Sequence, residues 1–201
     1  NQVVFWGADF TAVKEVKDGL YRLDLVTKTT DCLIEPGLMK ISFAYWYGEK
    51  ILTAMSDGEK YGAGETPKLF LVDPQTKAQT LFNDNDATFG NAVGTDCAFG
   101  GSEMKKAAGT DFYAVMTDAD HTPLFRFDSQ GHRTEALPFD GAIFGFDLHG
   151  DTAYLIAMKD MKLQEIYEAN LKTGECVQRS HFNDAALAEC YVAKPKRLDY
   201  A

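Results

Sequence analysis

A short motif that returns four times constrains the fold of this chain more than any other feature. Each copy places an aromatic residue inside a short apolar segment that ends in Asp or Asn. The copies are LYRLD at 20–24, LFLVD at 69–73, LFRFD at 124–128 and IYEAN at 166–170. Their aromatic residues lie 49, 55 and 42 positions apart. A period of this size indicates a repeat architecture in which each unit is one supersecondary element.

The residues after each motif predict a tight turn and a second strand. Turn-forming residues follow at 27–29, 74–77, 129–131 and 172–174. Strand-like segments come next at 31–34, 78–82, 133–137 and 175–179. We therefore expect every unit to end in a β-hairpin. The Asp or Asn is expected to accept backbone N–H hydrogen bonds in the turn, and the aromatic residue to fill the gap between neighbouring sheets.

Further strand-like segments precede each hairpin. The nearer ones are 3–5, 51–55, 112–116 and 153–157, and the farther ones are 41–47, 93–99 and 143–148, with a last segment at 188–192. Four strands in about 40–50 residues are typical of a β-propeller blade, which must bury both faces against neighbours. We predict an all-β chain of about four four-stranded antiparallel blades. Short helical insertions are expected at 102–108 and at 183–189, the latter beginning at an Asn or Asp cap.

Two ring arrangements are compatible with four units. The segment 188–192 could complete the sheet begun at Val3 and close a four-bladed ring. Alternatively, the chain is part of a larger ring of seven or eight blades. The variable spacing and a first residue, Asn1, that leads directly into a strand-like segment favour the larger ring. An incomplete ring leaves a sheet face and an edge uncovered, so we expect self-association.

Composition narrows the classes of partner. The 201 residues include 30 acidic and 20 basic side chains, for a net charge of −10. This balance disfavours nucleic acid and anionic membranes, and no apolar run approaches the roughly 20 residues that span a bilayer. Four cysteines show no Cys-x-x-Cys pair and are interpreted as free thiols: Cys32, Cys97, Cys176 and Cys190. Free thiols favour a cytoplasmic location, with disulfides in an exported protein as the open alternative.

The sequence carries no recognisable catalytic motif. Ser102 follows two glycines but lacks the second Gly of Gly-x-Ser-x-Gly, and the four histidines fall at expected turns or strand ends. There is no phosphate-binding glycine loop. The acidic runs at 83–86 and 118–121 offer oxygen ligands without the pattern of a calcium loop. We predict no catalytic residue, no metal site and no cofactor in this chain.

A dense aromatic group leaves two interpretations. Trp6, Tyr45, Trp46 and Tyr47 could form an aromatic box for a ligand. Alternation along strands would instead place these side chains between sheets, and we favour packing.

The units resemble the propeller of the prolyl oligopeptidase family of serine peptidases, particularly its dipeptidyl-peptidase and acylaminoacyl-peptidase branches. Residues 20–29 and 167–174 carry the resemblance, through an aromatic-x-apolar-Asp or -Asn strand and its turn. The segment AKPKRLDY at 193–200 is similar to the family's connection into an α/β-hydrolase domain. The resemblance implies propeller blades over 1–193 and a linker over 194–201. No catalytic residue of the family falls within the chain.

The resemblance also implies a function and partners. The propeller would gate the access of peptides to a hydrolase domain of the same parent chain, and would be inert alone. One alternative is a stand-alone, TolB-like propeller that serves as a protein- or ligand-binding scaffold. Another is a propeller enzyme that acts on a carbohydrate or other small molecule in a central channel. This last alternative needs paired inward carboxylates, and the expected first strands offer only Asp147.

Overall fold

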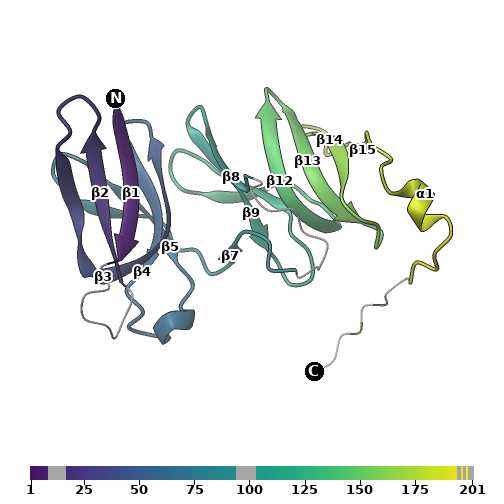
Figure 1. Ribbon diagram of the computed structural model, residues 1–201, viewed down its shortest axis with the longest axis horizontal. Helices are drawn as coiled ribbons and strands as arrows, with labels where there is room; N and C mark the ends of the chain where they lie inside the picture. Colours follow the sequence, from purple (N-terminus) through teal and green to yellow (C-terminus); the bar gives the residue numbers. More distant parts are fainter. Residues whose placement is uncertain (9–16, 94–102, 194–195, 197, 199–201) are drawn as a thin grey trace. The chain divides into compact units, whose positions relative to one another are not determined.

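The computed structural model describes residues 1–8, 17–93, 103–193, 196 and 198 (Figure 1). The described residues form antiparallel sheets, which confirms the predicted all-β class. The chain divides into two compact units, residues 1–87 with 129–132 and residues 88–128 with 133–201. No helix among the described residues is long and apolar enough to cross a membrane.

The first unit is one path of six strands in sequence order. They are β1 (Gln2–Ala8), β2 (Asp18–Asp24), β3 (Thr30–Tyr47), β4 (Lys50–Ser56), β5 (Lys68–Val72) and β6 (Gln79–Asn83). The sequence predicted separate strands at 31–34 and 41–47, but both belong to β3. This strand pairs with β2 over its first part and with β4 from Lys40 onward. Gly37 separates the two parts with a φ of +90°, a left-handed conformation that glycine adopts readily.

The two parts of this strand path share one core. Side chains on one face of β2 and the first part of β3 meet side chains from β4, β5 and the second part of β3. The cluster consists of Leu20, Leu33, Ile34, Ile41, Ala44, Ile51, Met55 and Val72. Burial of apolar surface between the two ladders is the main stabilisation of this unit.

The second unit contains two sheets. One is formed by β7 (Thr88–Phe89), β8 (Lys105–Ala108), β9 (Asp111–Thr117), β10 (Leu124–Phe127) and β11 (Arg133–Leu137). The other runs β12 (Gly141–His149), β13 (Thr152–Lys159), β14 (Glu165–Asn170) and β15 (Cys176–Gln178). Both β7 and β8 pair with β9. The expected helical turn at 102–108 is wrong for residues 105–108, which form β8. Of the expected strand at 93–99, Val93 lies in a bend and the rest lies outside the described residues.

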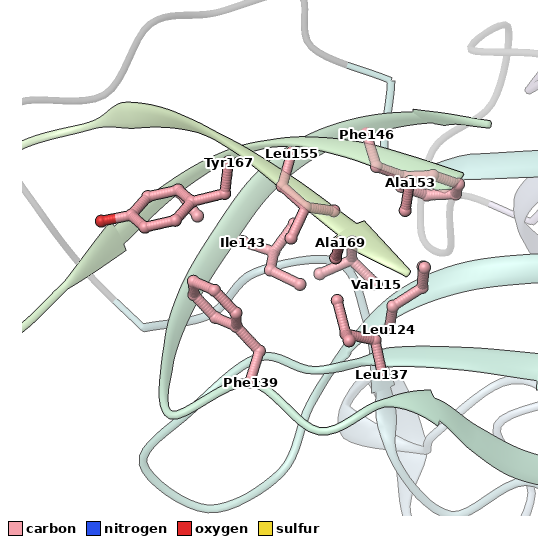
Figure 2. Packing of buried hydrophobic residues seen from close by; sticks show 11 residues of the cluster. Val115, Leu124, Leu137, Phe139, Ile143, Phe146, Ala153, Leu155, Tyr167 and Ala169 are labelled. Atoms are coloured by element: carbon pink, nitrogen blue, oxygen red, sulfur yellow. The ribbon is translucent and has the colours of Figure 1, made fainter. Parts of the chain in front are cut away.

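Figure 2 shows the core between these two sheets. Val115, Leu124 and Leu137 come from one sheet, and Leu155 and Ala169 come from the other. All five are at most 1% exposed. The motif aromatic Tyr167 lies in the same cluster, with its ring centroid 5.7 Å from that of Phe139. The prediction that this aromatic residue packs between neighbouring sheets is therefore correct here.

The segment after β15 differs from the expected closing strand. Residues 184–187 form the short helix α1 (Asp184–Leu187), as predicted, but 188–192 form a turn, a bend and coil. These residues therefore do not complete the sheet begun at Val3. Asn183 occupies the N-cap position but makes no side-chain cap bond; its side-chain N–H₂ group donates to Glu165 and to the carbonyl of Gln164. The sequence also gave no sign of the 3₁₀ turn η1 (Gly62–Gly64).

Candidate functional site

The acidic residue of the repeated motif shapes the turn that follows it. Oδ1 of Asp24 accepts hydrogen bonds from the backbone N–H groups of Val26 and Thr27, at 2.8 and 3.0 Å. Asp73 and Asn170 accept the same pair of bonds from residues two and three positions later, at 2.8–3.1 Å. Bonds from Thr27 and Val26 hold the pKa of Asp24 below its usual range. The predicted turn-capping role is confirmed at these three positions.

The same turn also uses one left-handed residue. Lys28 and Lys77 have φ values of 59°, and Gly174 has a φ of 75° at the equivalent place. Each donates its backbone N–H to the carbonyl of the motif Asp or Asn. Left-handed backbone is strained for residues with a Cβ, so the two lysines carry a cost that Gly174 avoids. The motif acid is therefore a structural residue.

A cavity of about 240 Å³ opens in the first unit beside the 57–67 segment. Met39, Met55, Phe70 and Leu81 form its apolar wall. Its polar side is formed by Ser56, Asp57, Glu65 and Lys68. The cavity therefore offers an apolar surface with both signs of charge at its edge.

The polar side of this cavity is already hydrogen-bonded. Glu65 accepts bonds from the backbone N–H of Tyr61 at 3.0 Å and of Lys60 at 2.9 Å, and from the Ser56 hydroxyl at 2.9 Å. The Tyr61 and Ser56 bonds lower the pKa of Glu65, so it stays ionised. Nζ of Lys68 lies 2.7 Å from Asp84. Because Ser56 donates to a carboxylate that the loop already holds, this arrangement positions the loop and does not activate a nucleophile.

A second hollow of about 440 Å³ lies elsewhere in the same unit. Its lining includes Gln2, Trp46, Glu49, Lys50 and Asp73. Asp73 is the motif residue in this lining, and its carboxylate already accepts two backbone N–H bonds in its own turn. It therefore has a structural role at the edge of the hollow.

The predicted thiols and metal candidates can now be placed. Cys32, Cys176 and Cys190 are free, and Cys97 lies outside the described residues. Burial raises the pKa of the Cys32 and Cys176 thiols. Within the described ranges, no group of three or more His, Cys, Asp or Glu residues is arranged to hold a metal ion.

The acidic runs instead make local contacts. In the run 83–86, Asp84 pairs with Lys68, and Asn85 donates to the carbonyl of Ala87. In the run 118–121, Asp120 lies 3.3 Å from Nδ1 of His121. These contacts account for both runs as loop structure.

The polar residues considered for catalysis are also placed by the structure. Ser102 lies outside the described residues. His181 contacts Asp184 at 2.9 Å on the exposed helix end. Asp147, the candidate channel carboxylate, forms an ion pair with Lys106. The hydrogen bond that Lys106 donates in this pair lowers the pKa of Asp147.

The aromatic residues of 45–47 do not all face the same way. Trp46 packs against the core of the first unit, whereas strand alternation directs Tyr45 and Tyr47 to the opposite face of β3. The Tyr45 ring lies 5.6 Å from Phe43, and the Tyr47 ring 5.7 Å from Phe82. These residues therefore do not form one box.

Neither a protein-family model nor a curated protein matches the chain. Solved structures do match it. The β-propeller domain of the trilobed protease from Pyrococcus furiosus is 16% identical with a TM-score of 0.64, over 91% of this chain and 53% of that chain. This chain has a β-propeller fold. It spans about half the length of that domain.

Other neighbours of the propeller include peptidases of the prolyl oligopeptidase family. The acylaminoacyl peptidase from Pyrococcus horikoshii is 17% identical with a TM-score of 0.67, over 94% of this chain and 27% of that chain. TolB from Acinetobacter baumannii is 14% identical with a TM-score of 0.55, over 81% of this chain and 37% of that chain. The resemblance to the propellers of this peptidase family is confirmed at the level of the fold.

The last sheet of the propeller leaves one face open. Strand alternation directs Tyr154 and Ile156 of β13, Ile166 of β14 and Val177 of β15 away from the core in Figure 2. Their exposed fractions are 45%, 41%, 39% and 37%. Ile156 is directly opposite Ile166 in the ladder. These four residues define an open apolar face, which we call the β12–β15 face.

The first sheet of the propeller has a similar open face. Val3 and Phe5 of β1 are 41% and 39% exposed on the side opposite the first unit's core. The Phe5 ring stacks on the motif residue Tyr21, with centroids 5.2 Å apart. We call the surface of Val3, Phe5, Tyr21 and Leu23 the β1–β3 face.

Sequence reasoning missed a buried carboxylate that several donors hold in place, Glu165. Glu165 is only 2% exposed, and its carboxylate accepts bonds from the Ser180 hydroxyl, the Phe182 N–H and the N–H and side-chain amide of Asn183. Burial raises its pKa, but these hydrogen bonds together lower it to about 2. The bonding partners lie 15–18 residues away, so no local pattern could have identified this site.

Proposed function

We propose that this chain is the non-catalytic propeller portion of a prolyl oligopeptidase-family serine peptidase. Its role is to gate the entry of peptides to an α/β-hydrolase domain of the same parent protein. The observation that carries the proposal is the match over 88–94% of this chain to the trilobed protease propeller, acylaminoacyl peptidase and puromycin hydrolase. At 16–18% identity these matches concern the fold, and the gating role is our inference from that fold.

The proposal includes a place in a larger ring. Four hairpin units supply four blades of a seven- or eight-bladed propeller, with blades over 1–193 and a linker over 194–201. The coverage of 53% of the trilobed protease domain supports this count. The two open faces support it as well, because each is a surface of the kind that neighbouring sheets cover elsewhere in this chain.

Gating by such a ring acts through physical access. A cover of stacked sheets admits short or extended peptides and rejects folded proteins, and it excludes bulk water from the reaction. The chain contributes chamber walls and no reacting group. The contacts of Ser56 and Asp147 described above are consistent with a structural use of its polar residues.

The test compares substrates of different size in the parent protein. We expect the parent to cleave a short chromogenic peptide far faster than the same sequence displayed within a folded protein. The 201-residue chain alone should neither cleave the peptide nor react with a fluorophosphonate probe. Cleavage by the chain that a serine-directed inhibitor abolishes would overturn the proposal, as would equal rates of the parent on both substrates.

A stand-alone, TolB-like scaffold is the second candidate, and the match to TolB from Acinetobacter baumannii favours it. The gene decides between the two. A Gly-x-Ser-x-Gly motif within the few hundred codons after Ala201 supports the peptidase, whereas a stop codon directly after Ala201 supports the scaffold. The cytoplasmic location remains part of the proposal, and fractionation of source cells tests it.

A further inference from the structure

We propose that the cavity beside the 57–67 segment binds a small organic ammonium ion. The apolar group of this ligand lies against the apolar wall of the cavity, and its positive charge lies beside Asp57 and Glu65. The inference goes beyond the proposed function, because it uses only residues of the first unit. It holds for a peptidase propeller and for a stand-alone scaffold alike.

Strand pairing builds the apolar wall. Met55 of β4 is directly opposite Lys68 of β5. Phe70, two positions after Lys68, is directly opposite Leu81 of β6. Side chains at opposed and at alternate positions share a face of the sheet, so these four line one side, and Met39 of β3 completes the wall. Thioether side chains adapt to the shape of an apolar group, and an aromatic ring attracts a cation held over its face.

The cavity has the size of a small ligand. Its volume of about 240 Å³ equals the share of about eight water molecules in the liquid, so a ligand of roughly that many non-hydrogen atoms fits. Met55 is fully buried, whereas Leu81 is 50% exposed. The wall therefore runs from the core to the surface, which gives a ligand a way in.

The 57–67 segment is already held in place around this space. Its backbone N–H groups at Lys60 and Tyr61 donate to Glu65, as described above. Lys40, which does not line the cavity, ties the segment to β3 because its Nζ donates to the carbonyl of Ala63 at 3.2 Å. A site that is formed in advance costs less ordering when a ligand binds.

The charges at the cavity edge select a cation. The lining carries two carboxylates and one ammonium group, on Asp57, Glu65 and Lys68. Nζ of Lys68 is paired at 2.7 Å with Asp84, so its positive charge already has a partner. Asp57 accepts the backbone N–H of Glu59 through Oδ1, and its Oδ2 can accept from a ligand. An ammonium ion therefore gains a carboxylate partner here, whereas an anionic ligand meets two like charges.

The experiment titrates three probes of similar size into the full 201-residue chain. Benzylammonium carries an aromatic ring and a positive charge, benzyl alcohol the same ring without charge, and benzoate the ring with a negative charge. Isotope-labelled methionine methyl groups report binding by NMR, since Met39 and Met55 line the cavity. The methionines outside the lining are internal controls: Met104, Met116, Met158 and Met161. We expect benzylammonium to bind with a Kd of about 1 mM, and the other two probes to bind at least about tenfold more weakly.

Two pairs of variants test the charge and the wall. Asp57→Ser removes the carboxylate but keeps an oxygen for the N–H of Glu59, and should reduce the preference for benzylammonium over benzyl alcohol to about twofold or less. Glu59→Gln is its matched control, because this exposed residue of the same segment does not line the cavity. Leu81→Asn should weaken both probes at least about threefold, and Val26→Asn, in an exposed turn of the same unit, should weaken neither. Thermal melting checks that each variant is folded.

The wild-type titrations decide the proposal even if a variant fails to fold. Saturable shifts confined to the methyl groups of Met39 and Met55, tightest for benzylammonium, support it. The absence of a saturable shift at these two methyl groups, shifts spread evenly over all methionines, or benzoate binding as tightly as benzylammonium would overturn it. A preference for the cation that survives Asp57→Ser, or that Glu59→Gln reduces equally, would overturn it as well.

Discussion

The backbone N–H of Asn183 donates a 2.8 Å hydrogen bond to Oε1 of Glu165 and ties the segment after β15 to the start of β14. The Ser180 hydroxyl and the Phe182 N–H bond the other carboxylate oxygen. A buried carboxylate with this many donors is stable only while all of them stay in place. Glu165 therefore links the last sheet to the chain that follows it.

Replacing Glu165 with Gln should destabilise the fold. The amide places an N–H₂ group against donors and loses bonds to a charged acceptor, at a cost of about 2–3 kcal/mol in the free energy of unfolding. Urea denaturation measures this cost. Glu168→Gln on the same strand is the control, because it removes only a partly exposed ion pair worth about 1 kcal/mol or less. Equal effects of the two substitutions would contradict the role of Glu165.

The same group predicts a dependence on pH. Folding lowers the pKa of Glu165 from 4.5 to about 2, so its contribution is complete above the unfolded pKa and is lost as the pH falls towards the folded pKa. The difference in unfolding free energy between wild type and Glu165→Gln should shrink as the pH falls from about 7 to about 3. Asp24 and Asp73 titrate in both proteins and cancel in the difference. A difference that stays constant would rule out this linkage.

The repeated turn predicts a cost at its left-handed position. Gly174 has a φ of 75°, so Gly174→Ala introduces backbone strain of about 1–2 kcal/mol even though space is open around it. Gly64→Ala is the control, since Gly64 also lies in open space but without a left-handed φ. Thermal unfolding of both variants provides the comparison. The turn assignment fails if Gly64→Ala is the more destabilising of the two.

Truncation of two adjacent residues of β13 should destabilise the fold to different extents. Leu155 is 1% exposed in the core of Figure 2, so Leu155→Ala should cost about 2–5 kcal/mol. Ile156→Ala, on the open face, should cost about 1 kcal/mol or less when measured at concentrations where the chain is monomeric. Similar costs would mean that the two faces are wrongly assigned.

Most strands could be predicted because their signals are local. Alternating apolar residues and the Asp-turn pattern located β4, β9, β11 and β13 to within about two residues, since period-2 alternation follows directly from the pleat. The turn role of Asp24 was equally local, because its partners are two and three residues away.

The features that the sequence predicted wrongly or missed depend on interactions between residues far apart in the chain. Pro36 and Gly37 resemble a break between strands, yet β3 continues through them because both of its ends are paired in ladders. Residues 188–192 were expected to form a strand, but they form a turn, a bend and coil after α1, in a segment that the distant Glu165 anchors through Asn183. The loop contacts of Glu65 were also unpredictable, since a lone Glu in a polar loop gives no indication of its acceptor role.

The central claim is that this propeller belongs to a serine peptidase, and labelling the natural protein tests it most directly. An antibody to the 201-residue chain would isolate the protein from its source, and a fluorophosphonate probe would report an activated serine. The account predicts a labelled protein larger than 22.3 kDa, with the label outside the residues of this chain. An unlabelled protein of 22.3 kDa, or a label within the chain itself, would contradict it.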